Sequence, residues 1–312
     1  MLAYAARRIL GLIPVLFTAV VLCFVAIQFV PGDPITVLLS DHAGDPALEA
    51  RLRADYGLDR PLVVQFADYV VGILRGDFGL SFRFANLPVS EIIGTSLVIS
   101  PILALSALAI ALPLGLVLGT FAALRRNSAA DTAVIVVLVA GISIPNFAMA
   151  AFLVYLFAIR LGLLPVAGWG SPEQLILPVL VLAIPPMAYI ARLTRTYMLE
   201  VLQQDYIRTA RAKGLRERLV IWRHALRNTL VPLLTTVGII FGGLLSGTFV
   251  VETIFNIPGL GRLAIESIFA RDYPVTMAIV LLFTAFYAGI NLLVDLLYGL
   301  IDPRIRLGGE GA

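Results

Sequence analysis

Residues 200–232 read EVLQQDYIRTARAKGLRERLVIWRHALRNTLVP and form the one long hydrophilic run in the second half of an otherwise apolar chain. Apolar residues recur through this stretch at helical spacing, in two sets: Leu199, Leu202, Tyr206 and Ala210, then Leu215, Leu219, Trp222 and Leu226. The spacing predicts two short amphipathic helices that connect two membrane spans. An apolar stripe with aromatic residues needs a membrane surface or a partner's groove to lie against. A solvated basic connector is the alternative.

A glycine separates the two predicted helices. We expect Asp205 to cap the N-terminus of the first helix, because its carboxylate can accept a hydrogen bond from a free backbone N–H. Arg211 and Lys213 then lie in the last turn, where the helix dipole favours positive charge. Gly214 follows at the position where a left-handed residue commonly ends a helix. The sequence therefore predicts a bend at Gly214.

This basic stretch resembles the coupling loop of a transporter family. Residues 209–215 (TARAKGL) and 224–228 (HALRN) are similar to that loop in bacterial ATP-binding-cassette (ABC) importer permeases, in particular the first permease subunit of dipeptide, oligopeptide and nickel importers. The family's general pattern is Glu-Ala-Ala, three residues, Gly, nine residues, Ile-x-Leu-Pro. The residues that match it are Ala210, Gly214 and Leu226, and those that depart from it are Arg208, Thr209, His224 and Arg227. These departures are habitual in the peptide-importer branch.

The composition indicates an integral membrane protein. Hydrophobic residues make up 60% and charged residues 14% of the 312 residues, and the mean hydropathy is +0.96. A soluble domain is about one-quarter charged and about half apolar. The net charge of +3 says little by itself, and we expect no nucleic-acid partner.

Six apolar runs approach or exceed the roughly 20 residues that a bilayer crossing requires. They cover residues 9–30, 96–124, 132–159, 175–191, 230–251 and 275–298. The first is an anchor, because it is too long for the core of a cleaved signal peptide and no small-residue cleavage site follows it.

Prolines such as Pro14 and Pro145 predict bends in these runs. Close helix packing is predicted at four glycines of the fifth run, Gly238, Gly242, Gly243 and Gly247. A face toward a second permease or the pore is the alternative.

The runs predict an all-α membrane protein with about six transmembrane helices, and the resemblance implies the type I ABC importer permease fold. We expect a transmembrane anchor at residues 1–30, a long external loop at 31–95, a transmembrane core at 96–299 with a cytoplasmic coupling loop at 192–229, and a tail at 300–312. Basic residues concentrate on the cytoplasmic side of membrane proteins. With the N-terminus inside, the basic clusters all lie inside, at residues 7–8, 125–126, 192–227 and 304–306. Both termini are therefore expected to be cytoplasmic.

The external loop is far longer than a turn requires, and long loops are usually functional or disordered. Residues 62–74 can form an amphipathic helix with Val63, Phe66, Val70 and Ile73 on one face. Further segments resemble the same family, namely FVPGDP at 29–34, YGLDRP at 56–61, GDFGLS at 76–81 and the stretches 252–262, 271–274 and 302–306. We expect the loop to help receive an external binding protein, and a folded cap without partners is the alternative.

The chain has no sequence that could hydrolyse ATP. A phosphate-binding loop requires Gly-Lys-Ser/Thr, whereas the only lysine, Lys213, is followed by Gly214. His42 and His224 lie far apart and Cys23 is the single cysteine, so neither a metal site nor an intrachain disulfide is expected. An ion-coupled secondary transporter or a channel is the alternative function, weakened because the ionisable residues of the spans lie near span ends.

The resemblance implies a non-catalytic permease subunit of an ABC importer that passes di- or oligopeptides across the cytoplasmic (inner) membrane. It also implies a second permease subunit, one or two ABC ATPase subunits that bind ATP and magnesium, and an extracytoplasmic solute-binding protein, besides membrane lipid. The residues expected to couple this chain to the ATPase are Asp205, Tyr206, Arg208, Ala210, Arg211, Lys213, Gly214, Leu215, Leu219, Trp222 and His224. The choice among dipeptide, oligopeptide, glutathione, heme and nickel as the solute stays open.

Overall fold

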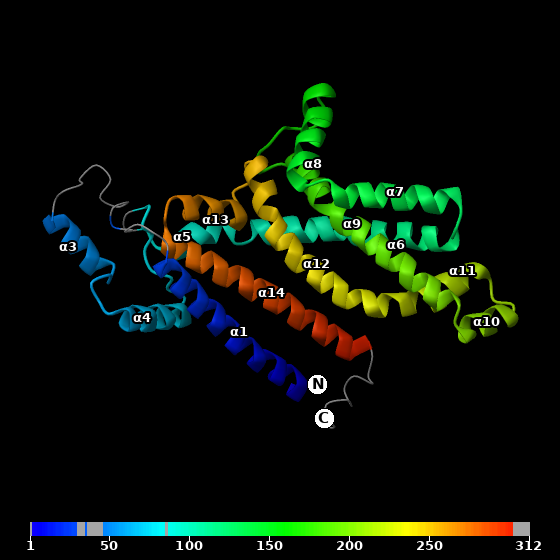
Figure 1. Cartoon of the computed structure of the whole chain (residues 1–312), viewed down its shortest axis with the longest axis horizontal. Helices are drawn as coiled ribbons and strands as arrows, with labels where there is room; N and C mark the ends of the chain where they lie inside the picture. The colour runs from blue at the N-terminus through cyan, green and yellow to red at the C-terminus, as the bar shows by residue number, and fades with distance from the viewer. Residues whose placement is uncertain (1, 30–34, 36–45, 85–86, 302–312) are drawn as a thin grey trace. The chain divides into compact units, whose positions relative to one another are not determined.

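The computed structural model describes residues 2–29, 35, 46–84 and 87–301, and every regular element within these ranges is a helix (Figure 1). The chain divides into two compact units. The first contains Pro101–Ile257 and the chain from Gly289 onward, and the second contains Leu2–Ser100 and Pro258–Ala288. The predicted all-α fold is confirmed for the described part of the chain.

Among the described residues, five helical segments are long and apolar enough to cross a membrane. They are α1 (Leu2–Gln28), α5 (Val89–Ser96) with α6 (Ile99–Leu124), α9 (Pro172–Leu202), α12 (Leu226–Ile254) and α14 (Tyr273–Ile301). Each coincides with one predicted run. However, α9 continues to Leu202, so the loop that follows this helix is shorter than the predicted 192–229.

The remaining predicted span, residues 132–159 (the third run along the chain), is not one straight helix. It divides into α7 (Ala129–Ser143) and α8 (Asn146–Leu153), which π-helix η2 (Val154–Arg160) continues, and the two arms meet at 104°. Pro145 lacks an N–H and forces the residue before it into an extended conformation, so the α-helix cannot continue. At 1.5 Å per residue, each arm is only about 22 Å long, which is shorter than the ~30 Å of a bilayer core. The predicted bend is therefore a break.

Helix α9 packs against α7, α8 and α12 in the first unit. Two glycines of α6 allow a close approach to α9: a Cβ added to Gly119 would lie 2.6 Å from Cβ of Thr194, and one added to Gly115 would lie 2.8 Å from Cγ2 of Ile190. Gly115 and Gly119 form a small-x-x-x-small pair that the sequence analysis overlooked. Of the glycines it did name, Gly238 packs closely, since an added Cβ would lie 2.8 Å from Val294, whereas Gly243 has open space around it.

The second unit is built on helix α13 (Leu260–Phe269), α5 and the start of α14, which share a buried apolar cluster. The cluster contains Val89, Ile93, Leu260, Ala264, Val275, Ala278 and Ile279. Before α5 come α3 (Pro46–Asp55) and α4 (Leu62–Arg75). The helix predicted over 62–74 is thus confirmed to within one residue, and Gly76 ends it in the left-handed conformation.

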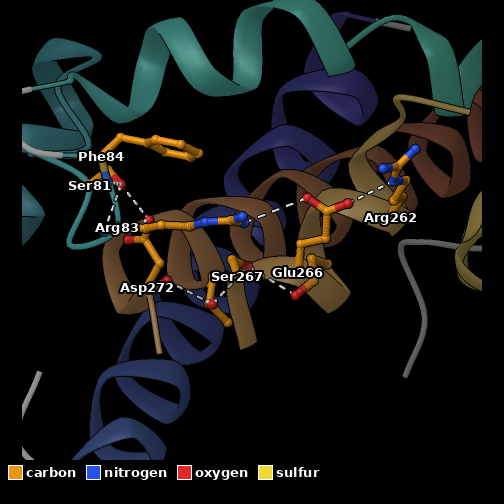
Figure 2. A network of polar contacts seen from close by, with 9 residues as sticks. Ser81, Arg83, Phe84, Arg262, Glu266, Ser267 and Asp272 are labelled. Atoms are coloured by element: carbon orange, nitrogen blue, oxygen red, sulfur yellow. Dashed lines mark hydrogen bonds and ion pairs between the residues drawn. The ribbon is translucent and has the colours of Figure 1, made fainter. Parts of the chain in front are cut away.

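A buried carboxylate, Asp272, fastens the segment before α5 to the α13–α14 corner of the second unit (Figure 2). Its Oδ2 accepts a hydrogen bond from the Ser81 hydroxyl, and its Oδ1 accepts one from the Phe82 N–H at 3.0 Å. Glu266 lies 3.7 Å from Arg83 and 2.7 Å from Arg262 at the edge of this network. The sequence analysis assigned no role to Asp272.

Candidate functional site

The predicted bend at Gly214 is a regular helix-terminating turn. Helix α10 runs over Asp205–Ala212, and Gly214 follows with φ +75°. The Gly214 N–H donates to the Arg211 carbonyl at 2.9 Å and the Leu215 N–H donates to the Ala210 carbonyl at 3.3 Å. These two bonds define the Schellman motif, in which a left-handed residue satisfies the last carbonyls of a helix. The prediction that Gly214 ends the helix in a left-handed conformation is therefore confirmed.

The prediction that Asp205 caps the helix is wrong by one residue. Gln204 occupies the cap position and its side chain makes no capping hydrogen bond. Asp205 is the first helical residue, and its carboxylate lies 3.4 Å from the Arg208 guanidinium. A carboxylate in the first turn still benefits from the positive end of the helix dipole, so the residue fits the N-terminus without capping it.

The second predicted helix is not a separate element. Helix α11 (Glu217–Leu219) continues through a π-helical segment, η3 (Val220–Ala225), directly into α12. The loop between the two membrane helices α9 and α12 therefore contains one free helix, α10, and one helical extension of α12. π-Helical segments are frequent at functional sites. A displacement of α11 would be passed directly to the membrane span that it extends.

The base of the loop is buried against three long helices. Ile207 and Ala210 of α10 share a cluster with Ala123 of α6, Met198 of α9, Val220 and Ala225 of η3 and Leu226 at the start of α12. Ile207 is fully buried, whereas Tyr206, which the predicted stripe contained, is exposed. The predicted stripe was therefore wrong at Tyr206 and right at Ala210. The spacing of Ile207 and Ala210 (i, i+3) was the signal that could have identified the buried face.

An ion pair spans the glycine turn. The Arg211 guanidinium donates to both carboxylate oxygens of Glu217, at 3.1 Å from Nε and 2.6 Å from Nη2. These hydrogen bonds hold the pKa of Glu217 below its ordinary value and raise the pKa of Arg211. Both side chains are about half exposed, so the pair orients α11 relative to α10 more than it stabilises the fold. The sequence analysis named Arg211 but missed Glu217.

The outer surface of the loop is apolar and basic together. Trp222 is 53% exposed and, with Leu219, Arg216 and Arg218, lines an open hollow. Among the remaining predicted residues, Arg208, Lys213 and Leu215 are exposed and His224 is half-buried. The predicted stripe therefore divides into two parts, since Ala210 and Leu226 face the protein and the aromatic residues face outward.

A second charged pair ties the start of α7 to α9. The Arg195 guanidinium donates to both oxygens of Asp131, at 2.8 and 2.7 Å, and the Asn127 N–H donates to the same carboxylate at 3.0 Å. Asp131 is buried, and Arg195 lies one helical turn before Met198 of the buried cluster. Through α9 this pair joins the α6–α7 turn to the base of the loop. No set of three His, Cys, Asp or Glu side chains that could hold a metal ion occurs among the described residues.

Two protein-family descriptions match this chain. The binding-protein-dependent transport system inner membrane component matches residues 115–307, and the N-terminal part of the membrane component of such systems matches residues 1–104. The chain belongs to this family. It is therefore a multi-pass membrane permease of the ABC importer type, a class that works with ATPase and other subunits.

The permease is similar in sequence to known proteins along almost its whole length. It is 43% identical over 311 residues to the dipeptide transport system permease protein DppB of Bacillus subtilis, covering 100% of both chains. It is 42% identical over 306 residues to the glutathione transport system permease protein GsiC of Shigella flexneri, covering 98% of this chain and 99% of that one. A structure of the MetNI methionine ABC transporter in an inward facing conformation matches with a TM-score of 0.59 at 16% identity, over 68% of this chain and 97% of that chain. This last similarity confirms the fold that the resemblance implied.

Proposed function

We propose that this permease imports di- or oligopeptides as one of two membrane subunits, and that residues 203–226 couple it to ATP hydrolysis on a partner subunit. The named functions of the 42–43% identical relatives, dipeptide and glutathione transport, support a peptide as the solute. The chain contributes no catalytic group of its own. Its partners in this proposal are a second permease, one or two ATPases that hold ATP and magnesium, and a solute-binding protein on the outside.

One observation carries the coupling role: the loop is buried at its base and exposed at its surface. Ile207, Val220 and Leu226 are buried among α6, α9 and α12. Trp222 and Leu219 are exposed beside basic side chains, as a surface that docks into another protein would be. Force applied to this surface would therefore reach three membrane helices without first deforming the loop.

The proposal also determines the orientation of the chain in the membrane. The coupling surface has to lie on the cytoplasmic side, where ATP is present, and the basic residues of this stretch agree with that placement. Both termini are then cytoplasmic and the segment between α1 and α5 is external. A cysteine placed at Glu49 should react with a membrane-impermeant thiol reagent added to intact cells, and one placed at Gln203 should not. Labelling at Gln203 from outside would reverse the orientation.

The decisive experiment replaces Gly214 by valine. A residue with a Cβ in the left-handed conformation costs about 1 kcal/mol or more, so Gly214→Val should turn α11 and Trp222 away from their present direction. We expect membrane abundance near normal and ATPase activity present, but peptide uptake lost and ATP hydrolysis no longer stimulated by the loaded binding protein. Normal uptake at normal abundance would contradict the coupling role.

Gly162→Val is the matched control. Gly162 has φ +61°, lies in the same unit as Gly214 and, like Gly214, has no atom within 4 Å of an added Cβ. The two substitutions therefore introduce the same kind of backbone strain, but only one of them lies in the loop. If both variants lost stimulation equally, general strain would explain the result and the coupling role would fail.

A further inference from the structure

Helix α4 has an apolar surface much wider than its contact with the protein. The rings of Phe17 and Phe24 in α1 meet the ring of Phe66 in α4 edge-on, with centroids 6.2 and 5.2 Å apart. On the neighbouring side of α4, Val63 is 80% and Leu74 is 82% exposed, and Val71 lies between them on the helical surface and is also exposed. At 100° per residue these three side chains fall within a sector of about 80°. They form one aliphatic stripe, which no described part of the second unit covers.

The contact with α1 places Phe66 of α4 beside a candidate membrane span. The apolar window of α1, Arg8–Gln28, contains 21 residues and at 1.5 Å per residue is about 31 Å long, the thickness of a bilayer core. Phe24 lies about 6 Å and Phe17 about 16 Å from the Gln28 end of that window. Because the Phe66 ring contacts both rings, it lies beside the outer half of a membrane span and not beyond its end.

The polar side chains of α4 lie on another side of the helix, its polar edge, away from the aliphatic stripe. Gln65 donates to the Arg60 carbonyl at 2.8 Å, and Asp68 accepts from the Arg60 guanidinium at 2.8 Å. Together with residues 54–58, 77–80 and 82 this edge lines a hollow of about 340 Å³. Polar groups therefore collect on the side of α4 that faces the rest of the loop, and aliphatic groups on the side that continues the surface of α1.

We propose that α4 lies in the bilayer interface beside α1, with Val63, Val71 and Leu74 in contact with lipid acyl chains. Three features favour lipid over a protein partner. The stripe adjoins α1, a candidate membrane span whose side chains are mostly exposed in this chain, as lipid-facing side chains would be. It contains only aliphatic side chains, whereas protein interfaces are enriched in aromatic residues and arginine. Finally, an amphipathic helix with a strong apolar face binds in this way at membrane interfaces.

This placement depends on the membrane location of α1 and not on the identity of the solute. It narrows the expectation for the external loop at residues 31–95, which was predicted from the sequence to help receive an external binding protein. The bilayer would hold α4 down at the membrane surface, so the parts of the external segment free to meet a binding protein would lie elsewhere, outside α4.

Nitroxide labels at single cysteines test the proposal on the full-length permease, assembled with its partner subunits in vesicles of phosphatidylethanolamine and phosphatidylglycerol. Cys23→Ala provides the background, with labels at Val63→Cys and Leu74→Cys on the stripe and at Asp68→Cys and Arg75→Cys on the polar edge. We expect the ratio of collisions with oxygen to collisions with a water-soluble nickel chelate to be several-fold higher at the stripe. Leu74 and Arg75 are sequence neighbours, so this pair is the sharpest comparison.

Two results would overturn the proposal. Equal ratios at Leu74 and Arg75 would mean that the stripe faces water, and protection of the stripe from both oxygen and nickel would mean that a protein covers it. If the cysteine-free chain fails to insert, Leu74→Trp in the native chain serves instead. Its fluorescence should be quenched by brominated lipid more strongly than that of Arg75→Trp, and equal quenching would again count against lipid contact.

Discussion

The coupling turn around Gly214 and the buried corner around Asp272 hold the chain in opposite ways. At the turn, every contact across the bend joins residues close in sequence, such as Arg211 and Glu217, and the charged groups remain half exposed. At the corner, Asp272 is 2% exposed and accepts hydrogen bonds from Ser81 and Phe82, about 190 residues earlier. The turn therefore orients the exposed surface of the coupling loop, whereas the corner holds together two segments that are distant in sequence.

The difference predicts where substitutions will affect stability and where they will affect function. Removing a buried acceptor leaves its donors without partners and without water, which is costly. Removing one member of an exposed ion pair leaves the other member solvated, which costs little. A surface that has to meet and release a partner can be held by weak local contacts, because its stability comes from the cluster beneath it.

The largest effect is expected for Asp272→Ala. The Ser81 hydroxyl and the Phe82 N–H would lose their acceptor in a buried site, at a cost on the order of 3 kcal/mol. We expect a marked fall in the unfolding temperature of the purified permease in detergent, and lower abundance in membranes. Ser128→Ala is the control, because it also removes a single hydrogen-bonding side chain, here a helix cap at about 1 kcal/mol. Equal unfolding temperatures for the two variants would contradict the role given to Asp272.

A smaller effect is expected from Ile207→Ala, which weakens the base of the coupling loop. Ile207 is fully buried, so its truncation should cost about 2 kcal/mol and loosen α10 from α6 and α9. Faster hydrogen exchange of residues 205–212 would report this loosening. Tyr206→Ala, at the exposed neighbour, should leave the exchange unchanged. Faster exchange in Tyr206→Ala than in Ile207→Ala would restore the original stripe, in which Tyr206 and not Ile207 faces the protein, and equal exchange would contradict the role given to Ile207.

Glu217→Gln should change stability by only about 0.2–1 kcal/mol, yet weaken coupling. The amide cannot pair with the Arg211 guanidinium as a carboxylate does, so α11 would be held less firmly to α10. We expect a normal unfolding temperature, normal basal ATP hydrolysis and a partial loss of stimulation by the loaded binding protein. Arg53→Gln, which removes a similarly exposed ion pair with Glu49 within α3, serves as the control. A full response to the binding protein in Glu217→Gln would show that the pair is dispensable.

The smallest effect is the pH dependence of the same pair. Hydrogen bonds from Arg211 lower the pKa of Glu217, so the contribution of the pair is complete above the ordinary pKa of about 4.3 and is lost as pH falls through the lowered pKa. In a Trp169→Phe variant, the emission of Trp222 should stay constant around neutral pH and change only in acid. The transition should be absent when Glu217→Gln is added, and a transition that persists there would assign it to another group.

The sequence alone predicts well those features that depend on neighbouring residues. Apolar runs of about 20 residues indicated the membrane helices, and helical spacing indicated α4. The left-handed turn followed from Gly214 at the end of a helical pattern with cations in its last turn. Where two local rules competed, both left their mark: the 132–159 run is apolar enough to span a membrane, and Pro145, at which a bend was predicted, divides it into arms at 104°.

Only the tertiary structure decided which distant groups meet. Nothing near Asp131 in the sequence points to Arg195, and nothing near Asp272 points to Ser81, because burial of a carboxylate depends on segments brought together by the fold. The same holds for Ile207 and Tyr206: both are apolar enough for a buried face, and the positions of α6 and α9 selected Ile207. Local patterns determine where helices form, since their hydrogen bonds lie within the segment, whereas packing determines which faces are covered.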